Sequence, residues 1–393
     1  MSLLRGKHCS LFLAAVLFCL TVTGCPSPLP EVLVPDFVGM NRYVAQAGIT
    51  TAGLQLGLVS NEFSATIVAG GIVRQEPAAG ARVAAGSSVN LVVSKGPEVV
   101  TFADLVLDVI IRRAIGKESG DIYSNELVGL VILDEVDRGI EDLSGLEHCI
   151  NLEVVSLQLN GISDLTPLGR LSHLETLWLA ANQISDLSPL SGLTNLRRLD
   201  VRSNQIDDVS ALASLPNLEW LRLDSNPIGD LGSLAGLRHL QNLSVNYAEV
   251  DDLTPLAGLV NLQYVSLNYN QISDLSPLAG LAGLVSAGLA WNQIADLEPL
   301  AGLTGLEWLG LTGNLISDLT PLSGLTNLDA LLLGANQIAN LSPLVSNMGL
   351  GIGEDDYVYL SDNPLDQEAL CIEIPALELR LVTVYHHGTC ETE

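Results

Sequence analysis

Basic residues and aromatic rings are scarce in this sequence, and their scarcity narrows the range of partners. The 393-residue chain has 17 Lys and Arg against 45 Asp and Glu, a formal net charge of −28 and a pI near 4.3. A nucleic-acid-binding surface needs clustered cations to neutralise phosphates, so we exclude nucleic acid as a partner. Aromatic residues make up only 4% of the chain, which makes the positions of those few rings informative.

Long hydrophobic runs are also missing. Beyond residue 25 no segment offers the roughly 20 uncharged apolar residues that a membrane-spanning helix needs. The one apolar run, 11–20, is too short to span and follows Arg5 and Lys7, an arrangement typical of a secretory signal. We therefore predict a signal peptide at 1–24, followed by a short Pro/Ser tether at 25–32.

What the chain does contain is a 22-residue repeat over 130–350. One unit reads L-x-x-L-x-L-x-x-N-x-I from Leu174 to Ile184, and adding or subtracting 22 finds the same residue types. This is the leucine-rich repeat pattern, whose units stack into a solenoid with a curved parallel sheet. Ten regular units begin between Leu130 and Leu328. The fold class is therefore a multidomain chain dominated by an α/β leucine-rich repeat solenoid.

Two polar columns recur with the leucines, and we interpret both as scaffold. The repeated asparagines are predicted to bond backbone groups at each turn, and Ala248 interrupts them, so the turn there should be irregular. The repeated aspartates, such as Asp186 and Asp274, lie at the start of each convex turn beside Ser-Pro and Thr-Pro pairs. We read those pairs as helix N-caps and predict no metal site.

A smaller domain precedes the repeats, at 33–97. A helical run at 42–52 and strand-like runs at 54–59, 71–75 and 88–93 predict one helix on a three-stranded sheet. The V-P-D-x-x-G opening from Val34, the A-G-L turn from Ala52, Q-x-P-A-x-G from Gln75 and V-V-S-K-G-P ending at Pro97 resemble a PASTA domain, a small α+β module. The resemblance implies a location outside a bacterial membrane and binding of peptidoglycan, or a role as a spacer.

Covering elements are expected at both ends of the solenoid, since an open end would expose a leucine layer. A helix at 102–115, with Phe102, Leu105, Val109 and Ile110 among its apolar positions, lies in the cap region 98–129. This region resembles the helical N-terminal cap of bacterial internalin-like proteins. Residues 351–393 contain a last, modified repeat after an insertion of about five residues, and a C-terminal cap.

The six cysteines divide by location. Cys9 and Cys19 lie in the predicted signal, and Cys149 occupies an inward leucine slot, so it belongs to the core. Cys371 and Cys390 remain, and in an oxidising compartment we expect them to form a disulfide that closes the C-terminal cap.

The signal ends in Val22-Thr23-Gly24-Cys25, which resembles the lipobox of bacterial lipoproteins. That resemblance implies cleavage before Cys25 and lipidation of its thiol. The protein would then contact the membrane through its N-terminal lipid only, in the cell envelope or at the cell surface.

Candidate functional residues appear where the repeats differ. The sequence holds no G-x-S-x-G, H-E-x-x-H or phosphate-loop motif, so we expect neither catalysis nor a cofactor. Outward strand positions instead collect all four tryptophans with tyrosines and arginines, the residues typical of protein-binding hot spots. The predicted concave binding face comprises Trp178, Arg198, Arg202, Trp220, Arg222, Tyr247, Tyr264, Tyr269, Trp291 and Trp308.

Three functional hypotheses follow. The first is an envelope-anchored, non-catalytic recognition protein that binds a protein ligand on the concave face; a carbohydrate is the alternative ligand, since sugars stack on exposed rings. The second is a structural envelope protein whose main contact is peptidoglycan. The third is a regulator of an envelope enzyme.

Overall fold

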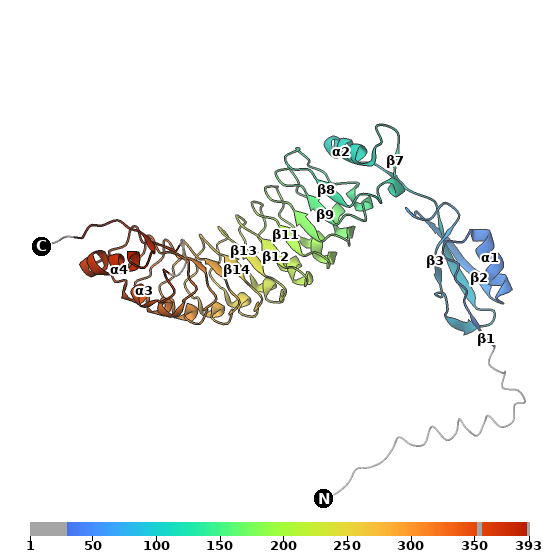
Figure 1. The fold of residues 1–393 in the computed structure, drawn as a ribbon. Coiled ribbons are helices and arrows are strands. Elements are labelled where there is room, and N and C mark those ends of the chain that lie inside the picture. The colour runs from blue at the N-terminus through green and yellow to red at the C-terminus, as the bar shows by residue number, and fades with distance from the viewer. Residues whose placement is uncertain (1–29, 352–355, 391–393) are drawn as a thin grey trace, which may run out of the picture. The chain divides into compact units, whose positions relative to one another are not determined.

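The computed structural model describes residues 30–351 and 356–390, and the chain divides into two units at Glu98/Val99 (Figure 1). The predicted signal peptide and Cys25 lie outside the described residues. None of the described helices is long and apolar enough to cross a membrane.

The N-terminal unit is one helix packed against a small sheet. Parallel and antiparallel pairing gives the sheet order β2-β5-β3, and β1 pairs with β4 as a separate ribbon. The elements are β1 (Glu31–Leu33), α1 (Arg42–Thr51), β2 (Gln55–Glu62), β3 (Ile72–Glu76), β4 (Arg82–Ala84) and β5 (Ser88–Ser94). The predicted helix and three strands are confirmed.

Local sequence explains these elements. Asn41 caps α1 by accepting the Tyr43 N–H, and Gly53 ends the helix in the left-handed region, where a glycine pays no steric cost. Gln75 holds the opening segment: its Oε1 accepts the Phe37 N–H at 2.7 Å and its Nε2 donates to the Pro35 carbonyl at 2.8 Å.

The solenoid is a twelve-stranded parallel sheet, with strands in chain order from β8 to β19. Figure 1 shows the repeats as an arc with short helical turns along its outer side. The strands are β8 (Ile132–Asp134), β9 (Val154–Ser156), β10 (Thr176–Trp178), β11 (Arg198–Asp200), β12 (Trp220–Arg222), β13 (Asn242–Ser244), β14 (Tyr264–Ser266), β15 (Ser286–Gly288), β16 (Trp308–Gly310), β17 (Ala330–Leu332), β18 (Tyr357–Tyr359) and β19 (Thr383–Tyr385).

Successive strands from β8 to β17 pair with a register shift of 22 residues, and the step from β17 to β18 is 27. The inward-facing leucines of the repeats form one continuous core, against which the half-buried Leu130 also packs. Cys149 lies in that core with no exposed surface and remains a free thiol. The predicted period, the late insertion and the core role of Cys149 are confirmed.

The asparagine ladder, meaning the repeated asparagines from Asn160 to Asn336 together with Asn363, is largely buried and fully bonded. Asn204 is typical: its Nδ2 donates to the carbonyls of Leu179 and Val201, and its Oδ1 accepts the Ile184 N–H. Each amide thus ties two successive turns together.

The turn at Ala248 is irregular, as the missing asparagine predicts. The Ile228 N–H donates to the Asn226 carbonyl at 2.9 Å, and the Gly229 N–H donates to the Ala248 carbonyl at 2.9 Å. Gly229 and Glu249 both adopt positive φ; among the described units the position of Glu249 has a positive φ elsewhere only at Gly139, which follows Arg138, the other residue that stands in place of an asparagine.

The aspartate column begins each outer turn, but the expected capping residue was wrong. The Asp186 Oδ1 accepts the Ser188 N–H at 2.7 Å, and the same contact recurs at Asp274 and Ser276. The aspartate carboxylate therefore satisfies the first N–H of the turn, the N-cap residue is the leucine that follows the aspartate, and the Ser-Pro and Thr-Pro residues begin the short 3-10 helix. These helices are Thr166–Arg170, Ser188–Gly192, Ser210–Ser214, Gly232–Leu234, Thr254–Leu256, Ser276–Leu278, Glu298–Leu300 and Thr320–Gly324.

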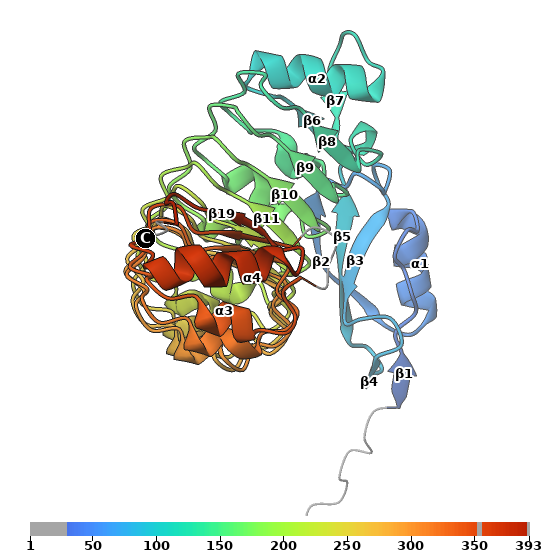
Figure 2. The ribbon, with the colours of Figure 1, turned by 60° about the vertical axis from the view of Figure 1, so that its left-hand side comes forward.

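The N-terminal cap is α2 (Leu105–Ile115) with the ribbon β6 (Val99–Val100) and β7 (Ile122–Tyr123) (Figure 2). Asp104 caps the helix by accepting the Val106 and Leu107 N–H groups. Leu107, Ile110 and Ile111 face the core, whereas Leu105 and Val109 are exposed. The predicted helix is confirmed, although Phe102 precedes it and two of its apolar positions, Leu105 and Val109, do not contribute to the core.

The C-terminal cap follows β17. It contains α3 (Ser342–Ser346), the π-helical turn Ala369–Glu373, α4 (Ile374–Glu378) and the edge strand β19. Glu373 is buried and accepts the Leu341 N–H at 2.7 Å and the Ser342 hydroxyl at 2.6 Å, which joins the cap to the last regular repeat. Cys371 and Cys390 form the predicted disulfide.

Candidate functional site

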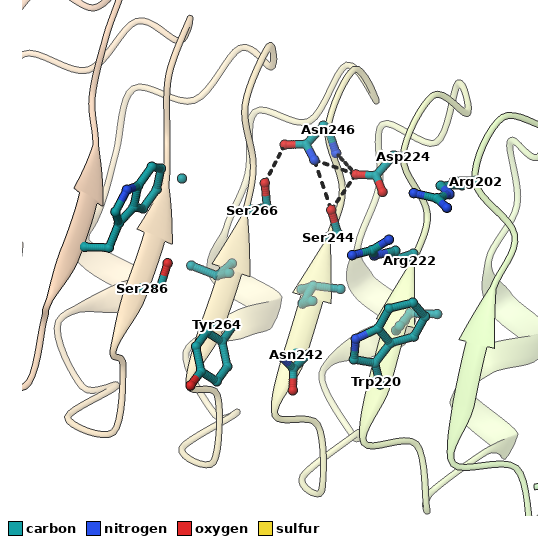
Figure 3. A pocket seen from close by; sticks show the side chains of 15 residues that line it. Arg202, Trp220, Arg222, Asp224, Asn242, Ser244, Asn246, Tyr264, Ser266 and Ser286 are labelled. Atoms are coloured by element: carbon teal, nitrogen blue, oxygen red, sulfur yellow. Dashed lines mark hydrogen bonds between the residues drawn. The ribbon is translucent and has the colours of Figure 1, made fainter. Parts of the chain in front are cut away.

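A hollow of about 390 Å³ opens on the inner face of the sheet between β11 and β16 (Figure 3). Five of the predicted residues line it: Arg202, Trp220, Arg222, Tyr264 and Trp308. They reach it because residues on either side of the central inward residue of each strand point away from the core.

The first row of the hollow is the aromatic column, which we define as Trp220, Asn242, Tyr264, Ser286 and Trp308. These residues are in direct register on β12 to β16. Tyr264 is exposed and the other four are half-buried. Figure 3 shows Trp220, Asn242 and Tyr264 side by side along the strands.

The floor beside this column becomes smooth toward its C-terminal end. Gly288 and Gly310 occupy the positions that carry Arg222 and Ser244 on earlier strands. A Cβ at Gly310 would lie 2.5 Å from the Trp308 ring, so the glycine lets that indole lie down against the sheet.

A polar network forms the second row and consists of Asp224, Ser244, Asn246, Ser266 and Asn268. The Asp224 Oδ1 accepts the Ser244 hydroxyl and the Asn246 Nδ2, each at 2.6 Å. The Asn246 Oδ1 accepts the Ser266 hydroxyl at 2.9 Å, and the Asn268 Nδ2 donates back to Ser266 at 2.9 Å. Figure 3 shows part of this closed chain of bonds, which fixes the floor of the hollow.

The N-terminal end of the hollow is basic. The Arg222 guanidinium lies 4.7 Å from the centre of the Trp220 ring, a cation–π contact. Arg202 pairs with Asp200, Nε to Oδ2 at 3.3 Å, and Asp200 is buried. Burial raises the pKa of Asp200 despite the nearby arginines.

Two predicted residues lie beside the hollow without lining it. Arg198 is exposed on β11, in register with Trp220. Trp178 on β10 is half-buried, and its indole nitrogen is buried without a hydrogen-bond partner among the described residues. Neither side chain lines the hollow, although Arg198 lies on the strand next to Trp220, at the end of the hollow.

The remaining predicted residues form a separate ring stack of Tyr247, Tyr269 and Trp291. Their ring centres are 4.2 Å and 5.8 Å apart with nearly parallel planes. Each has a positive φ between 54° and 57°, so the chain has left the strand and simple alternation no longer applies. Because the faces of these rings are stacked on one another, the rings lie at the edge of the concave surface and do not line the hollow.

Sequence reasoning passed over the polar residues that complete the hollow. Asn242 lies 22 residues after Trp220, and Ser286 lies 22 residues before Trp308, so the repeat period alone places both residues in the aromatic column. The prediction included only aromatic and basic side chains and therefore omitted these polar residues.

Family models identify both units. The PASTA domain model matches residues 32–95, and a model of two leucine-rich repeat copies matches residues 172–214. The chain is therefore a leucine-rich repeat solenoid protein with a PASTA domain ahead of the repeats.

Solved structures define the solenoid further. An internalin of Listeria monocytogenes (inlF) is 30% identical, with a TM-score of 0.62 over 73% of this chain and 91% of that one. A leucine-rich repeat protein of Leptospira interrogans shares the fold at 24% identity and a TM-score of 0.51, over 61% of this chain and 68% of that one. The chain belongs to the internalin family.

Curated relatives match only through the PASTA region. A probable serine/threonine-protein kinase of Clostridium acetobutylicum is 35% identical over 66 residues, which is 17% of this chain. A second, of Clostridium perfringens, is 32% identical over 111 residues, 28% of this chain. The chain spans only 10% and 16% of the lengths of these two relatives, and no kinase domain is matched.

Proposed function

We propose that this protein is a non-catalytic recognition protein of the bacterial cell envelope, and that its solenoid binds a protein ligand in the inner hollow. Membership of the internalin family and the PASTA domain support an envelope or surface location. The hollow supports the binding role, because it brings aromatic and basic side chains together on the inner face of the sheet.

The observation that carries the proposal is the concentration of rare residue types. Only 17 basic residues and 4% aromatic residues occur in the whole chain, yet Arg202, Trp220, Arg222, Tyr264 and Trp308 line one hollow. Large rings and arginines bury much area at low entropic cost, which is why they dominate the binding energy of protein interfaces. A solenoid needs none of them at these positions to fold.

The N-terminal parts would hold this face in place. We propose that Cys25 carries the lipid, that the tether follows it, and that the PASTA domain contacts peptidoglycan or serves as a spacer. Tethering raises the effective concentration of the solenoid near envelope components, so the hollow would be occupied even by a ligand of low affinity.

The test is capture with matched variants of the chain from residue 26 onward. Immobilised wild type is compared with Trp220→Ala/Trp308→Ala, and with Trp291→Ala, which removes an indole outside the hollow. Quantitative mass spectrometry should find proteins that the double variant loses at least about tenfold and Trp291→Ala retains. If the double variant and wild type capture the same set, the hollow does not bind a protein ligand.

The similarity of the PASTA region to those of clostridial kinases favours a second candidate, in which peptidoglycan contact through this domain is the main function. Co-sedimentation with purified peptidoglycan separates the two. A structural protein would keep all of its envelope contacts in the Trp220→Ala/Trp308→Ala variant, whereas removal of residues 33–97 would abolish them.

A further inference from the structure

The three rings of the aromatic column occur on every second strand. Trp220, Tyr264 and Trp308 lie on β12, β14 and β16, with the short side chains of Asn242 and Ser286 between them. Neighbouring strands lie about 4.8 Å apart, so the rings recur about every 9.6 Å. The column is therefore a row of three rings separated by two slots.

Hydrogen-bonding groups along this row are free, in contrast to those of the polar network. The Asn242 amide, the Ser286 and Tyr264 hydroxyls and the indole N–H groups of Trp220 and Trp308 have no hydrogen-bond partner in the described parts of the chain. The neighbouring Ser244, Asn246, Ser266 and Asn268 are satisfied by one another. All five free groups can donate at least one proton, and they lie beside the rings on the outward side of the strands.

These dimensions match a polyproline II helix. It has three residues per turn and rises about 3.1 Å per residue, so one face recurs about every 9.3 Å. Two turns, about 19 Å, equal the four strand steps from Trp220 to Trp308. Its backbone makes no internal hydrogen bonds, and its carbonyls need outside donors, which aromatic-lined grooves supply in proline-rich recognition.

An extended β-strand fits less well. Its side chains recur on one face about every 6.7 Å, so it would lose register with the rings after one step. Inward-projecting side chains on a concave face also converge, which shortens the ring spacing toward that of the polyproline helix. A linear glycan, which also stacks on rings, is the rival occupant that the experiment has to distinguish.

Charge gives the ligand a direction. Arg198, Arg202 and Arg222 surround Trp220, whereas the strands β13 to β17 carry no basic residue. Arg202 is held by Asp200, and Arg222 lies over the Trp220 ring, which leaves the Arg198 guanidinium exposed beside the end of the row. Acidic groups of a ligand would be attracted to this end alone.

The geometry points to a specific ligand class: a proline-rich protein segment in the polyproline II conformation, with acidic residues at the end that lies over Trp220. This inference rests on the proposed function, since it names the kind of protein ligand that the hollow takes. Prolines would fill the slots over Asn242 and Ser286, and the free donors would bond the carbonyls of the segment.

The test uses the chain from residue 26 and a synthetic peptide of three proline turns that carries two glutamates at one end, made in both orientations. Calorimetric titration should show saturable micromolar binding of one orientation. A peptide of equal length and charge with glycine and serine in place of proline should bind at least about tenfold more weakly, because it is not preorganised. Arginines in place of the glutamates should weaken binding in the same way.

A register variant tests the spacing itself. Tyr264→Ser with Ser286→Tyr keeps the composition but places the rings on β12, β15 and β16. Both positions are outward, so the fold should hold, which circular dichroism and thermal unfolding check. Affinity should fall at least about tenfold, whereas Trp291→Ala should leave it unchanged. Arg198→Gln should weaken binding about threefold at low salt and less at high salt.

Equal binding of the glycine-serine peptide, or unchanged affinity of the folded register variant, would overturn the inference. So would binding of a β-1,4-linked N-acetylglucosamine hexasaccharide in place of the proline peptide. If no proline peptide binds but captured proteins still depend on Trp220 and Trp308, only the polyproline inference fails. If that dependence is also lost, the proposed function fails with it.

Discussion

Replacing one asparagine of the asparagine ladder with alanine should lower the free energy of unfolding of the solenoid. The size of the loss follows from the hydrogen bonds that the side chain makes. Asn292 lies in a regular part of the array and is 8% exposed. Its Nδ2 donates to the carbonyls of Leu267, Leu289 and, at 3.3 Å, Ala290, and its Oδ1 accepts the Ile272 N–H at 3.0 Å. The variant Asn292→Ala removes all four contacts.

The four contacts do not have equal consequences. Leu267 O also accepts from the Asn270 amide, Leu289 O from the Asn314 amide and Ala290 O from the Tyr269 N–H, so all three carbonyls keep a partner. Only the buried Ile272 N–H is left without one. An unsatisfied buried donor costs about 1–3 kcal/mol, and the lost bonds add to it, so we expect a loss of about 2–3 kcal/mol.

The chain already contains one repeat that lacks this amide, and it shows how the loss is relieved. At Ala248 the Ile228 N–H bonds to Asn226 O, which the positive φ of Gly229 permits. The residue equivalent to Gly229 in the Asn292 repeat is Ser273, whose Cβ opposes that conformation. Adding Ser273→Gly to Asn292→Ala should therefore recover about 1 kcal/mol, although Ser273→Gly alone should cost up to about 1 kcal/mol.

Hydrogen exchange followed by mass spectrometry over 268–276 is the primary assay, because repeat arrays can open locally. Urea unfolding followed by circular dichroism gives the overall change in the free energy of unfolding. The Asn292→Ala variant should exchange faster at Ile272, and the double variant should regain part of its protection. The reasoning is refuted if Ile272 stays as protected as in wild type, or if the two substitutions add without coupling.

Three further outcomes follow from buried and cross-linked groups. Burial raises the pKa of Asp200, so the folded state binds the proton of this carboxyl more tightly than the unfolded state does. The resulting stabilisation is fully present below the unfolded-state pKa of about 4, and it is lost as the pH rises through the folded-state pKa. Asp200→Asn should remove that loss, so its melting temperature relative to wild type should rise between pH 4 and pH 7; a constant difference would contradict this. Reducing the Cys371–Cys390 disulfide, which closes 19 residues, should cost about 3 kcal/mol and increase proteolysis within 356–390 only; equal cleavage with and without dithiothreitol would contradict it. Burial also raises the pKa of Cys149 to about 12, so a thiol reagent at pH 8 should label it only after unfolding, and rapid native labelling would show that its repeat opens.

The repeat period allowed most of the solenoid to be predicted from sequence. A 22-residue shift places each leucine, asparagine and aspartate in register, and the β-sheet reproduces that shift strand by strand. Periodicity failed where a segment is apolar on all sides. In α2 nearly every position from Leu105 to Ile111 is apolar, so no face stands out, and the buried Leu107 could not be told from the exposed Leu105.

The candidate site was predictable only as a set of outward positions. Strand alternation gave the column of Trp220, Tyr264 and Trp308. The same alternation was also extended beyond the end of the strand to Tyr247, where the left-handed backbone ends it. Which polar groups are bonded and which are free depends on side-chain contacts between repeats. Ser244 and Ser286 look alike in sequence, yet only Ser244 has its hydroxyl bonded.

The ring stack explains why part of the predicted face is better regarded as scaffold. Tyr247, Tyr269 and Trp291 occupy a left-handed position that other repeats fill with small residues such as Ala181 and Ser203, and bulky residues are disfavoured there. Stacked rings contribute about 0.5–1.5 kcal/mol per pair, enough to offset much of that cost. The Trp291 ring ends over Gly313, where a Cβ would lie 2.6 Å from it. The three rings thus stabilise one another along the solenoid, whereas the rings and free polar groups of the aromatic column are the ones that we propose to contact the ligand.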